Sequence, residues 1–219
     1  MRKFFVESPR SFGEKARAKR FDLLLQTFPK LDGMNVLDLG GRVEFWNAAP
    51  VRPKHLTIVN SVESEAGAAA SWCTQLVDDA CNLSSEQLTQ TYDLVFSNST
   101  IEHVGDIRRM QAFARSVKDH ASSYWIQTPN KRFPIEPHVI FPLHQYLPLF
   151  AKALVIRFWP LVHSNPSTLE RARNIALETE LLTRRQMAML FPDAEIISET
   201  WGAALPAKSL IAVKIGGRV

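Results

Sequence analysis

A short apolar run that ends in two adjacent glycines constrains the fold of this chain more than any other feature of its sequence. Residues 35–39 read Asn-Val-Leu-Asp-Leu, and Gly40 and Gly41 follow directly. A nearly continuous apolar run bounded by a glycine turn is typical of a strand that is buried on both faces. Strands of this kind occur mainly in parallel sheets covered by helices, so we expect residues 35–39 to form a central strand of an α/β sheet.

The rest of the chain alternates between strand-like and helix-like patterns. Further strand-like runs occupy residues 55–60, 75–77, 92–97, 123–127, 194–201 and 209–215. Helical spacing is found over residues 14–28 and 107–120, and the pairs Ser167/Glu170 and Thr183/Gln186 have the spacing of a capping box at a helix start. The alternation predicts one Rossmann-like domain with a mostly parallel sheet, helices on both faces and a C-terminal antiparallel strand pair.

Residues 129–166 interrupt this alternation. The segment holds seven prolines: Pro129, Pro134, Pro137, Pro142, Pro148, Pro160 and Pro166. Prolines at this density break long helices, yet residues 139–162 are strongly apolar. We interpret 129–166 as an insertion within the single domain that caps the carboxyl edge of the sheet and forms the acceptor pocket or a lid. Ordinary core packing or a homodimer contact is the alternative explanation for its apolar residues.

Composition and charge exclude several classes of protein. The net charge is only +4, and the basic residues are scattered; the densest stretch, residues 10–20, is interpreted as a solvated helix face. Basic and aromatic residues are not interleaved as in single-strand binders, so we expect no nucleic-acid partner, and membrane-surface contact is not expected. The two cysteines form no CxxC pair, which predicts neither a disulfide framework nor a metal site. Without a signal-peptide core, the chain is predicted to be cytoplasmic.

The residues that end the strands can bind a ligand. In open α/β sheets, ligands bind beyond the carboxyl ends of the strands. Gly40 and Gly41 would let the backbone approach a ligand, and the Asp38 carboxylate can hold an ammonium group or order the turn. A tight strand-to-helix turn explains the same residues without a ligand, so this motif by itself leaves the function open.

The order of motifs resembles the class I S-adenosylmethionine-dependent methyltransferases, especially the broad group of ubiquinone-biosynthesis and type-11 enzymes. Residues 38–41 resemble the first motif of that family, 79–80 its adenine-contact motif and 92–99 its fourth motif, with 101–104 following. The resemblance covers residues 35–127 and, less closely, the C-terminal strands. It implies S-adenosylmethionine as the cofactor and methyl transfer to a small acceptor, and the apolar insertion favours a greasy one.

The resemblance also implies a cofactor site built from strand ends: Asp38, Gly40, Gly41, Asn60, Asp79, Ala80, Asn98 and Ser99. The first three would support and contact the methionine part, Asn60 would face the ribose, the next two the adenine, and the last two would lie beside the methyl donor. His138 and His103 are the candidate catalytic bases, with His144 a weaker third. The alternative is that His103 is a helix-start residue that packs the loop and that His138 is a structural turn residue.

Two departures from the family pattern bear on activity. Arg42 and Glu44 stand where later glycines of the first motif are usual, and Asn60 stands where an acid usually grips the ribose. An asparagine can accept from one hydroxyl and donate to another, but carries no charge; Glu63 or Glu65 could substitute. These departures keep open a non-catalytic scaffold or partner subunit. A nicotinamide-dependent oxidoreductase is disfavoured because it requires a fuller GxGxxG turn.

Overall fold

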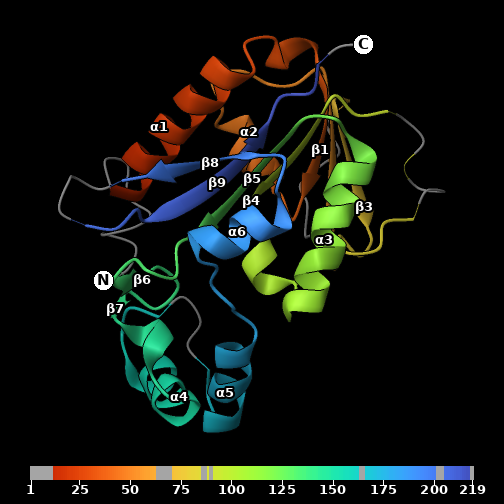
Figure 1. Cartoon of the computed structure of the whole chain (residues 1–219). Coiled ribbons are helices and arrows are strands. Elements are labelled where there is room, and N and C mark those ends of the chain that lie inside the picture. Colours follow the sequence, from red (N-terminus) through yellow and green to blue (C-terminus); the bar gives the residue numbers. More distant parts are fainter. Residues whose placement is uncertain are drawn as a thin grey trace.

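A seven-stranded sheet carries the fold (Figure 1). The computed structural model describes residues 12–62, 71–84, 88, 91–162, 166–200 and 205–217, with side chains from residue 18 onward. The strands are β1 (Asn35–Leu39), β2 (His55–Asn60), β3 (Cys73–Val77), β4 (Leu94–Asn98), β5 (Tyr124–Pro129), β8 (Glu195–Glu199) and β9 (Ser209–Lys214). Their order is β3-β2-β1-β4-β5-β9-β8, and β9 is antiparallel to both of its neighbours.

This topology confirms the predicted mostly parallel sheet with a C-terminal antiparallel pair. The chain steps outward from β1 through β2 to β3, returns to the other side of β1 as β4, and continues to β5. The carboxyl ends of β1 and β4 therefore lie side by side where the direction of winding reverses. In doubly wound sheets this switch point is where ligands bind.

Helices cover both faces of the sheet, as predicted. The helical elements are α1 (Phe12–Thr27), η2 (Leu31–Gly33), α2 (Val43–Asn47), η3 (Ile101–His103), α3 (Ile107–His120), η4 (His144–Tyr146), α4 (Leu149–Phe158), α5 (Leu169–Leu177) and α6 (Arg184–Leu190). Figure 1 shows α1 and α2 on one face and α3 and α6 on the other. The strand residues alternate between the two cores that these helices complete.

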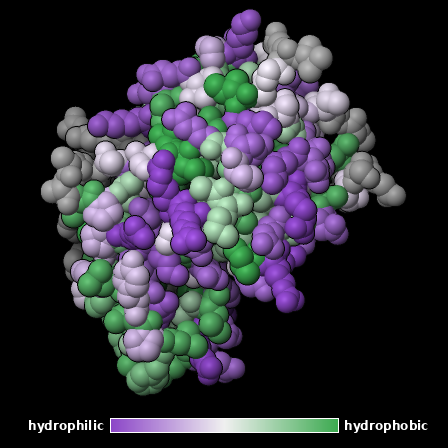
Figure 2. Space-filling view, in the orientation of Figure 1, coloured by the Kyte–Doolittle hydropathy of each residue, from purple (hydrophilic) through white to green (hydrophobic). Residues whose placement is uncertain are grey.

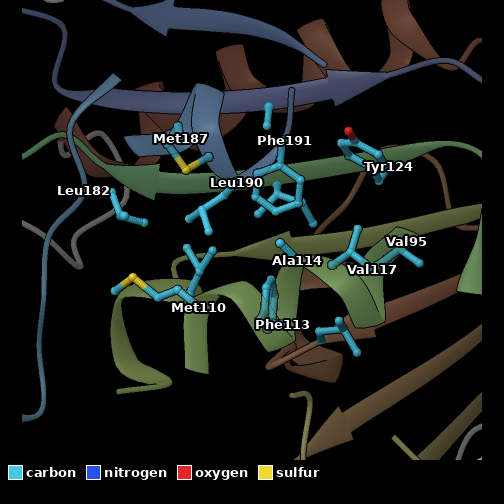
Figure 3. Packing of buried hydrophobic residues seen from close by; sticks show 14 of the residues in the cluster. Val95, Met110, Phe113, Ala114, Val117, Tyr124, Leu182, Met187, Leu190 and Phe191 are labelled. Atoms are coloured by element: carbon cyan, nitrogen blue, oxygen red, sulfur yellow. The ribbon is translucent and has the colours of Figure 1, made fainter. Parts of the chain in front are cut away.

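Both cores combine aliphatic and aromatic side chains. On the α3 and α6 face, Phe113 and Val117 of α3 and Leu190 of α6 belong to one buried aliphatic and aromatic cluster (Figure 3). On the α1 and α2 face, Trp46 is fully buried and packs edge-on against Phe96 with ring centroids 5.0 Å apart. Burial of apolar surface is the dominant favourable term in folding, and these large side chains supply much of it where the helical layers pack on the sheet.

The first helix corrects one expectation. Phe21, Leu24 and Phe28 are buried at helical spacing, as predicted. Arg20, however, is not on a solvated face: its guanidinium pairs with Glu199 at 2.8 Å, and the two side chains are only 13% and 12% exposed. Lys19 is exposed, whereas the side chains of residues 10, 15 and 17 lie outside the described residues. The prediction of a solvated face was wrong for Arg20 because it considered only the helix itself, whereas Arg20 pairs with an acid that is distant in sequence.

A small lobe stands apart from the seven-stranded sheet, and residues 129–166 contribute most of it (Figure 1). The lobe comprises β6 (Ile135–Glu136), β7 (Phe141–Pro142), α4 and α5. Its core contains Val139, Ala153 and Ile156 from the segment and Ala172 from α5, which follows it in sequence. Apolar side chains also gather on its surface (Figure 2), among them Leu143, Tyr146, Phe150, Phe158 and Leu177. Within the described chain, no helix has the length and apolar character needed to cross a bilayer.

The two predicted capping boxes have different outcomes. At α6, the Thr183 hydroxyl accepts from the Gln186 backbone N–H while the Gln186 side chain accepts from the Thr183 N–H, which confirms the box. At α5, the cap is Thr168 rather than Ser167, and its hydroxyl accepts from the Arg171 N–H. The box predicted at Ser167 is therefore wrong, because the helix begins one residue later.

We expect Thr183→Ala to lower the free energy of unfolding by about 1 kcal/mol, because the Gln186 backbone N–H at the start of α6 loses the hydroxyl that accepts from it. Urea unfolding followed by circular dichroism measures the change. Ser167→Ala is the matched control and should leave stability within about 0.5 kcal/mol. Equal effects of the two substitutions would contradict this assignment of the caps.

Candidate functional site

A cavity of about 290 Å³ lies at the carboxyl ends of the central strands. It is close to the lower limit, about 300 Å³, of pockets that hold drug-sized ligands. The lining residues come from the ends of β1, β2 and β4, from the turn after β3, from η3 and the residue after it, and from α3: Gly40, Val59, Asn60, Ser61, Asp79, Ala80, Ser99, Thr100, His103, Val104 and Arg109. The cavity therefore lies at the switch point of the sheet.

The turn after β1 requires glycine for reasons within the protein. Gly40 has φ +78°, a left-handed conformation that favours glycine, and a Cβ there would collide with the Thr100 side chain. A Cβ on Gly41 would collide with the Asp38 carboxylate. The absence of both Cβ atoms lets β1 end directly under the cavity, with the Gly40 N–H donating to the Val59 carbonyl at 2.8 Å.

Arg42 does not obstruct this turn. The residue is extended, with φ −134° and ψ 138°, and precedes α2 as its N-cap. It is exposed and is not among the residues that line the cavity. The departure from the family pattern at this position thus leaves the cavity open.

Asp38 is a buried acid beneath the glycine turn. Its Oδ2 accepts from the indole N–H of Trp46 at 2.7 Å, whereas its Oδ1 is buried without a hydrogen-bond partner. Burial raises the pKa of Asp38 to about 7, and the Trp46 hydrogen bond opposes part of that rise. A cation bound nearby would supply the missing interaction.

An ion pair lines the cavity at the turn after β3. The two terminal guanidinium nitrogens of Arg109 each donate to the Asp79 carboxylate at 2.8 Å, and this pair lowers the pKa of Asp79. Asp79 also accepts from the Cys81 backbone N–H. On the facing strand end, Asn60 donates through Nδ2 to the Gly41 carbonyl at 3.1 Å. The polar side chains that line this half of the cavity are therefore held in place by protein contacts.

The end of β4 sends neighbouring side chains in different directions. Ser99, with φ 58°, lines the cavity and donates to the Gln127 side chain. Asn98 does not line it: its side-chain carbonyl accepts from Arg20 at 2.6 Å. Arg20 in turn binds Glu199, whose carboxylate also accepts from Ser209. This network ties α1 to the carboxyl edge of the sheet.

Two histidines meet at the wall of the cavity. His103 lines it from η3, and His138 follows β6 in the lobe; their Nε2 atoms are 3.2 Å apart. His138 donates through Nδ1 to Glu136 at 2.6 Å, and Glu136 also accepts from the backbone N–H groups of His138 and Val139. The His138 ring is thereby held in one orientation.

A second cavity of about 250 Å³ begins on the other side of this histidine pair. Its polar lining includes Lys131, Glu136, His138, Lys152 and Glu180, and its apolar lining includes Ile156 and Ile175. Thr179 lines it as well and lies 3.4 Å from His103 Nδ1. The two cavities thus meet where His103 of one contacts His138 of the other.

Buried beside the pair, Glu102 has no exposed surface. Its Oε2 accepts from the Thr128 hydroxyl at 2.9 Å, but its Oε1 has no hydrogen-bond partner. Burial raises the pKa of this carboxyl to about 7.

The structure gathers most, but not all, of the predicted cofactor residues. Gly40, Asn60, Asp79, Ala80 and Ser99 line the first cavity. Asp38 and Gly41 lie beneath the turn, and Asn98 faces Arg20.

Of the predicted histidines, His103 and His138 come together, whereas His144 is buried in the wall of the second cavity. Thr100 and Arg109 line the first cavity but were not predicted. The only sequence signal for Thr100 is that it follows the fourth strand, and none marks Arg109.

The strand order and this cavity define the fold of the class I S-adenosylmethionine-dependent methyltransferases. No family model and no curated protein matches the chain by sequence. Solved structures do match. The chain is similar to the N-methyltransferase NodS from Bradyrhizobium japonicum WM9, with a TM-score of 0.57 and 12% identity over 94% of this chain and 99% of that one.

Two other matches have different acceptors. The small RNA methyltransferase HEN1 has a TM-score of 0.56 and 14% identity over 97% of this chain and 26% of that one. Magnesium protoporphyrin IX methyltransferase from Synechocystis PCC 6803, solved with bound S-adenosylhomocysteine, has a TM-score of 0.52 and 13% identity over 97% and 91% of the two chains. At these identities the comparison establishes the fold of this chain, but none of the matched structures identifies its acceptor.

Proposed function

We propose that this chain is an S-adenosylmethionine-dependent methyltransferase acting on a small acceptor. The observation that carries the proposal is the cavity at the switch point, which is lined by the glycine turn, Asn60 and Asp79 and adjoins a second cavity across the pair His103 and His138. One cavity for a donor and one for an acceptor, sharing a wall, is the arrangement that group transfer requires.

The residues of the first cavity fit the cofactor in chemistry. The buried, unpartnered Oδ1 of Asp38 suits a cationic group held above the glycine turn, Asn60 offers an amide toward a ribose, and Asp79 and Ala80 bound the adenine end. Ser99 would flank the methyl donor. Bound there, S-adenosylmethionine supplies an electrophilic methyl group on its sulfonium.

The histidine pair would serve the acceptor. Because the Nδ1–H group of His138 donates to Glu136, the proton of the neutral ring is on Nδ1, and the lone pair of Nε2 faces the boundary between the cavities. A base in this position can remove a proton from an acceptor hydroxyl or amine as the methyl group is transferred. His138 is thus the proposed base, with His103 beside it.

The second cavity suggests an acceptor with an apolar body and a polar end. Ile156 and Ile175 offer apolar surface, whereas Lys131 and Lys152 offer positive charge. Burial and the neighbouring Lys131 lower the pKa of Lys152. We therefore propose that the small lobe, including the segment 129–166, is the acceptor region, and that the protein works in the cytoplasm, consistent with its two free cysteines.

A non-catalytic partner subunit is the second candidate. It is favoured by the contacts that already occupy two cofactor groups: Arg109 takes both oxygens of Asp79, and the Gly41 carbonyl takes the Asn60 amide. Such a chain would fold in the same way but would not bind the cofactor.

Calorimetry with S-adenosylhomocysteine separates the two candidates. We expect 1:1 binding to the wild type, and Asp79→Ala should weaken it by about 10- to 100-fold, because the substitution removes the carboxylate from the adenine end. Asp93→Ala is the control: Asp93 is an exposed aspartate at the opposite edge of the sheet that accepts from the Asn35 N–H. Absence of binding to the wild type would leave only the non-catalytic candidate, whereas equal weakening by both substitutions would show that the ligand does not contact Asp79.

A further inference from the structure

Three side chains that can bind a metal ion converge at the boundary between the two cavities. They are Glu102 and His103 of η3 and His138 of the lobe, and one ligand atom of each lies within 4.8 Å of the other two. Two of the residues are adjacent in sequence, but the third is 35 positions away from His103, so spacing along the chain gave no sign of the cluster. The sequence-based expectation that the chain has no metal site considered only local spacing.

The orientation of His138 is that of a metal ligand. Its Nδ1 donates to Glu136 at 2.6 Å, which leaves the Nε2 lone pair directed at His103. Histidines that bind metals almost always donate their other ring N–H to a carboxylate, a carbonyl or water in this way. Glu136 is itself oriented by two backbone N–H groups, so the arrangement is rigid.

The spacing of the two rings suits a tetrahedral ion. Zinc–nitrogen bonds of about 2.0–2.1 Å at a tetrahedral angle place two nitrogens about 3.3–3.4 Å apart. The Nε2 atoms of His103 and His138 are 3.2 Å apart, and the rings are nearly perpendicular at 84°. A single proton shared between the rings also fits this distance, so a third group must distinguish the two interpretations.

Glu102 is that third group. It is completely buried, and its Oε1 has no hydrogen-bond partner. A carboxylate oxygen left without a donor in the protein interior is costly, and a cation beside it removes that cost. A proton shared by the two rings leaves Oε1 without a partner, whereas a metal ion bound to both rings can also bind the carboxylate.

We propose that Glu102, His103 and His138 form a binding site for a divalent transition-metal ion of the zinc and ferrous-iron class. Two imidazoles and one carboxylate match the ligand preferences of these ions and leave at least one position open. His103 lines the first cavity and His138 the second, so an external ligand at the open position would lie between donor and acceptor. A hydroxyl or water oxygen is the ligand class that such a position takes.

Metal binding is independent of the proposed function, because it requires no cofactor. If both hold, an acceptor hydroxyl bound to the ion would lose its proton to solvent water more readily, as water does on zinc. The two histidines would then act as ligands rather than as bases.

The test uses the whole chain after treatment with a chelator and without cofactor. Binding of Zn²⁺ is measured by calorimetry, and binding of Co²⁺ by visible absorption. We expect one equivalent to bind, with Co²⁺ bands typical of nitrogen and oxygen ligands. His103→Ala and His138→Ala should each weaken Zn²⁺ binding by at least about 100-fold, and Glu136→Gln by about 10- to 100-fold. His55→Ala is the control and should leave affinity unchanged, since His55 lies at the start of β2 and contacts Thr74.

Two outcomes would overturn the proposal. One is a wild type that takes up neither ion, which would leave a proton-bridged histidine pair only. The other is Zn²⁺ affinity that His138→Ala leaves intact. Melting curves with and without Zn²⁺ check that each variant folds. If Glu102→Gln, which removes the charge of the third ligand, does not fold, Glu136→Gln still tests the site because it keeps all three ligands. S-adenosylhomocysteine binding by the same variants shows separately whether the proposed function fails.

Discussion

Asp38→Asn should make the ligand-free protein more stable at pH 8 while weakening its cofactor binding. Burial raises the pKa of Asp38 to about 7, far above the value of 3.8 for an unburied aspartate. At pH 8 the folded protein therefore holds a buried carboxylate with an unpartnered oxygen. Asparagine keeps the shape and the acceptor for Trp46 but removes the charge, and we expect a gain of about 1–2 kcal/mol in the free energy of unfolding.

The pH dependence gives the sharper test. Below pH 3.8 the carboxyl is protonated in both the folded and unfolded states. Between 3.8 and about 7 the unfolded chain releases the proton while the folded chain retains it, so the wild type loses stability as pH rises, by on the order of 4 kcal/mol in all. The stability of Asp38→Asn relative to wild type should thus rise across this window and stay constant above it. A difference that is independent of pH would contradict the raised pKa.

Cofactor affinity should move in the opposite direction. If Asp38 faces the cationic part of the cofactor, Asp38→Asn weakens S-adenosylhomocysteine binding by about 10- to 100-fold, the value of a charge-assisted contact. Calorimetry at pH 8 measures this. Unchanged affinity in the stabilised variant would show that Asp38 serves only to order the turn above it.

Gly40→Ala should abolish detectable binding of S-adenosylhomocysteine and lower the free energy of unfolding by about 2 kcal/mol or more. The residue has φ +78°, and the added methyl group would collide with Thr100 in the cavity wall. Either Thr100 or the turn must shift, and both line the space where the cofactor is proposed to bind.

Gly33→Ala is the matched control for this loss. Gly33 lies in η2, its φ is outside the left-handed region, and a Cβ there meets no atom within 4 Å. The free energy of unfolding of Gly33→Ala should differ from that of the wild type by no more than about 1 kcal/mol, in either direction. Adding Thr100→Ala to Gly40→Ala should restore part of the stability, because two of the three colliding atoms are removed. Full affinity in Gly40→Ala would show that the turn does not contact the ligand.

The contrast between predicted and observed residues has a physical basis. The strands and α3 were predicted closely because hydrophobic periodicity and strand burial are local properties: residues 55–60 and 107–120 form β2 and α3 with the predicted bounds. The glycine turn was likewise evident, since its position directly after a buried strand restricts the backbone. The α5 cap was misplaced because Ser167 and Thr168 are both good caps, and only helix geometry chooses between them.

The side-chain partners in the site were not predictable by the same route. Arg20 contacts Asn98 and Glu199 from positions 78 and 179 residues away, and Arg109 closes on Asp79 from 30 residues away. Such pairs depend on which strand ends the topology makes adjacent. Nothing in the composition of either segment specifies them.

The sequence alone therefore determined the α/β class, the order of the strands along the chain and the glycine turn that ends the first of them, because each arises from short-range patterns of burial and backbone freedom. Only the tertiary structure decided that Arg42 leaves the cavity open, that Asn98 faces Arg20, and that His138 meets His103 beside Glu102. Those outcomes arise from the crossing of distant segments at one sheet edge, which local patterns do not encode.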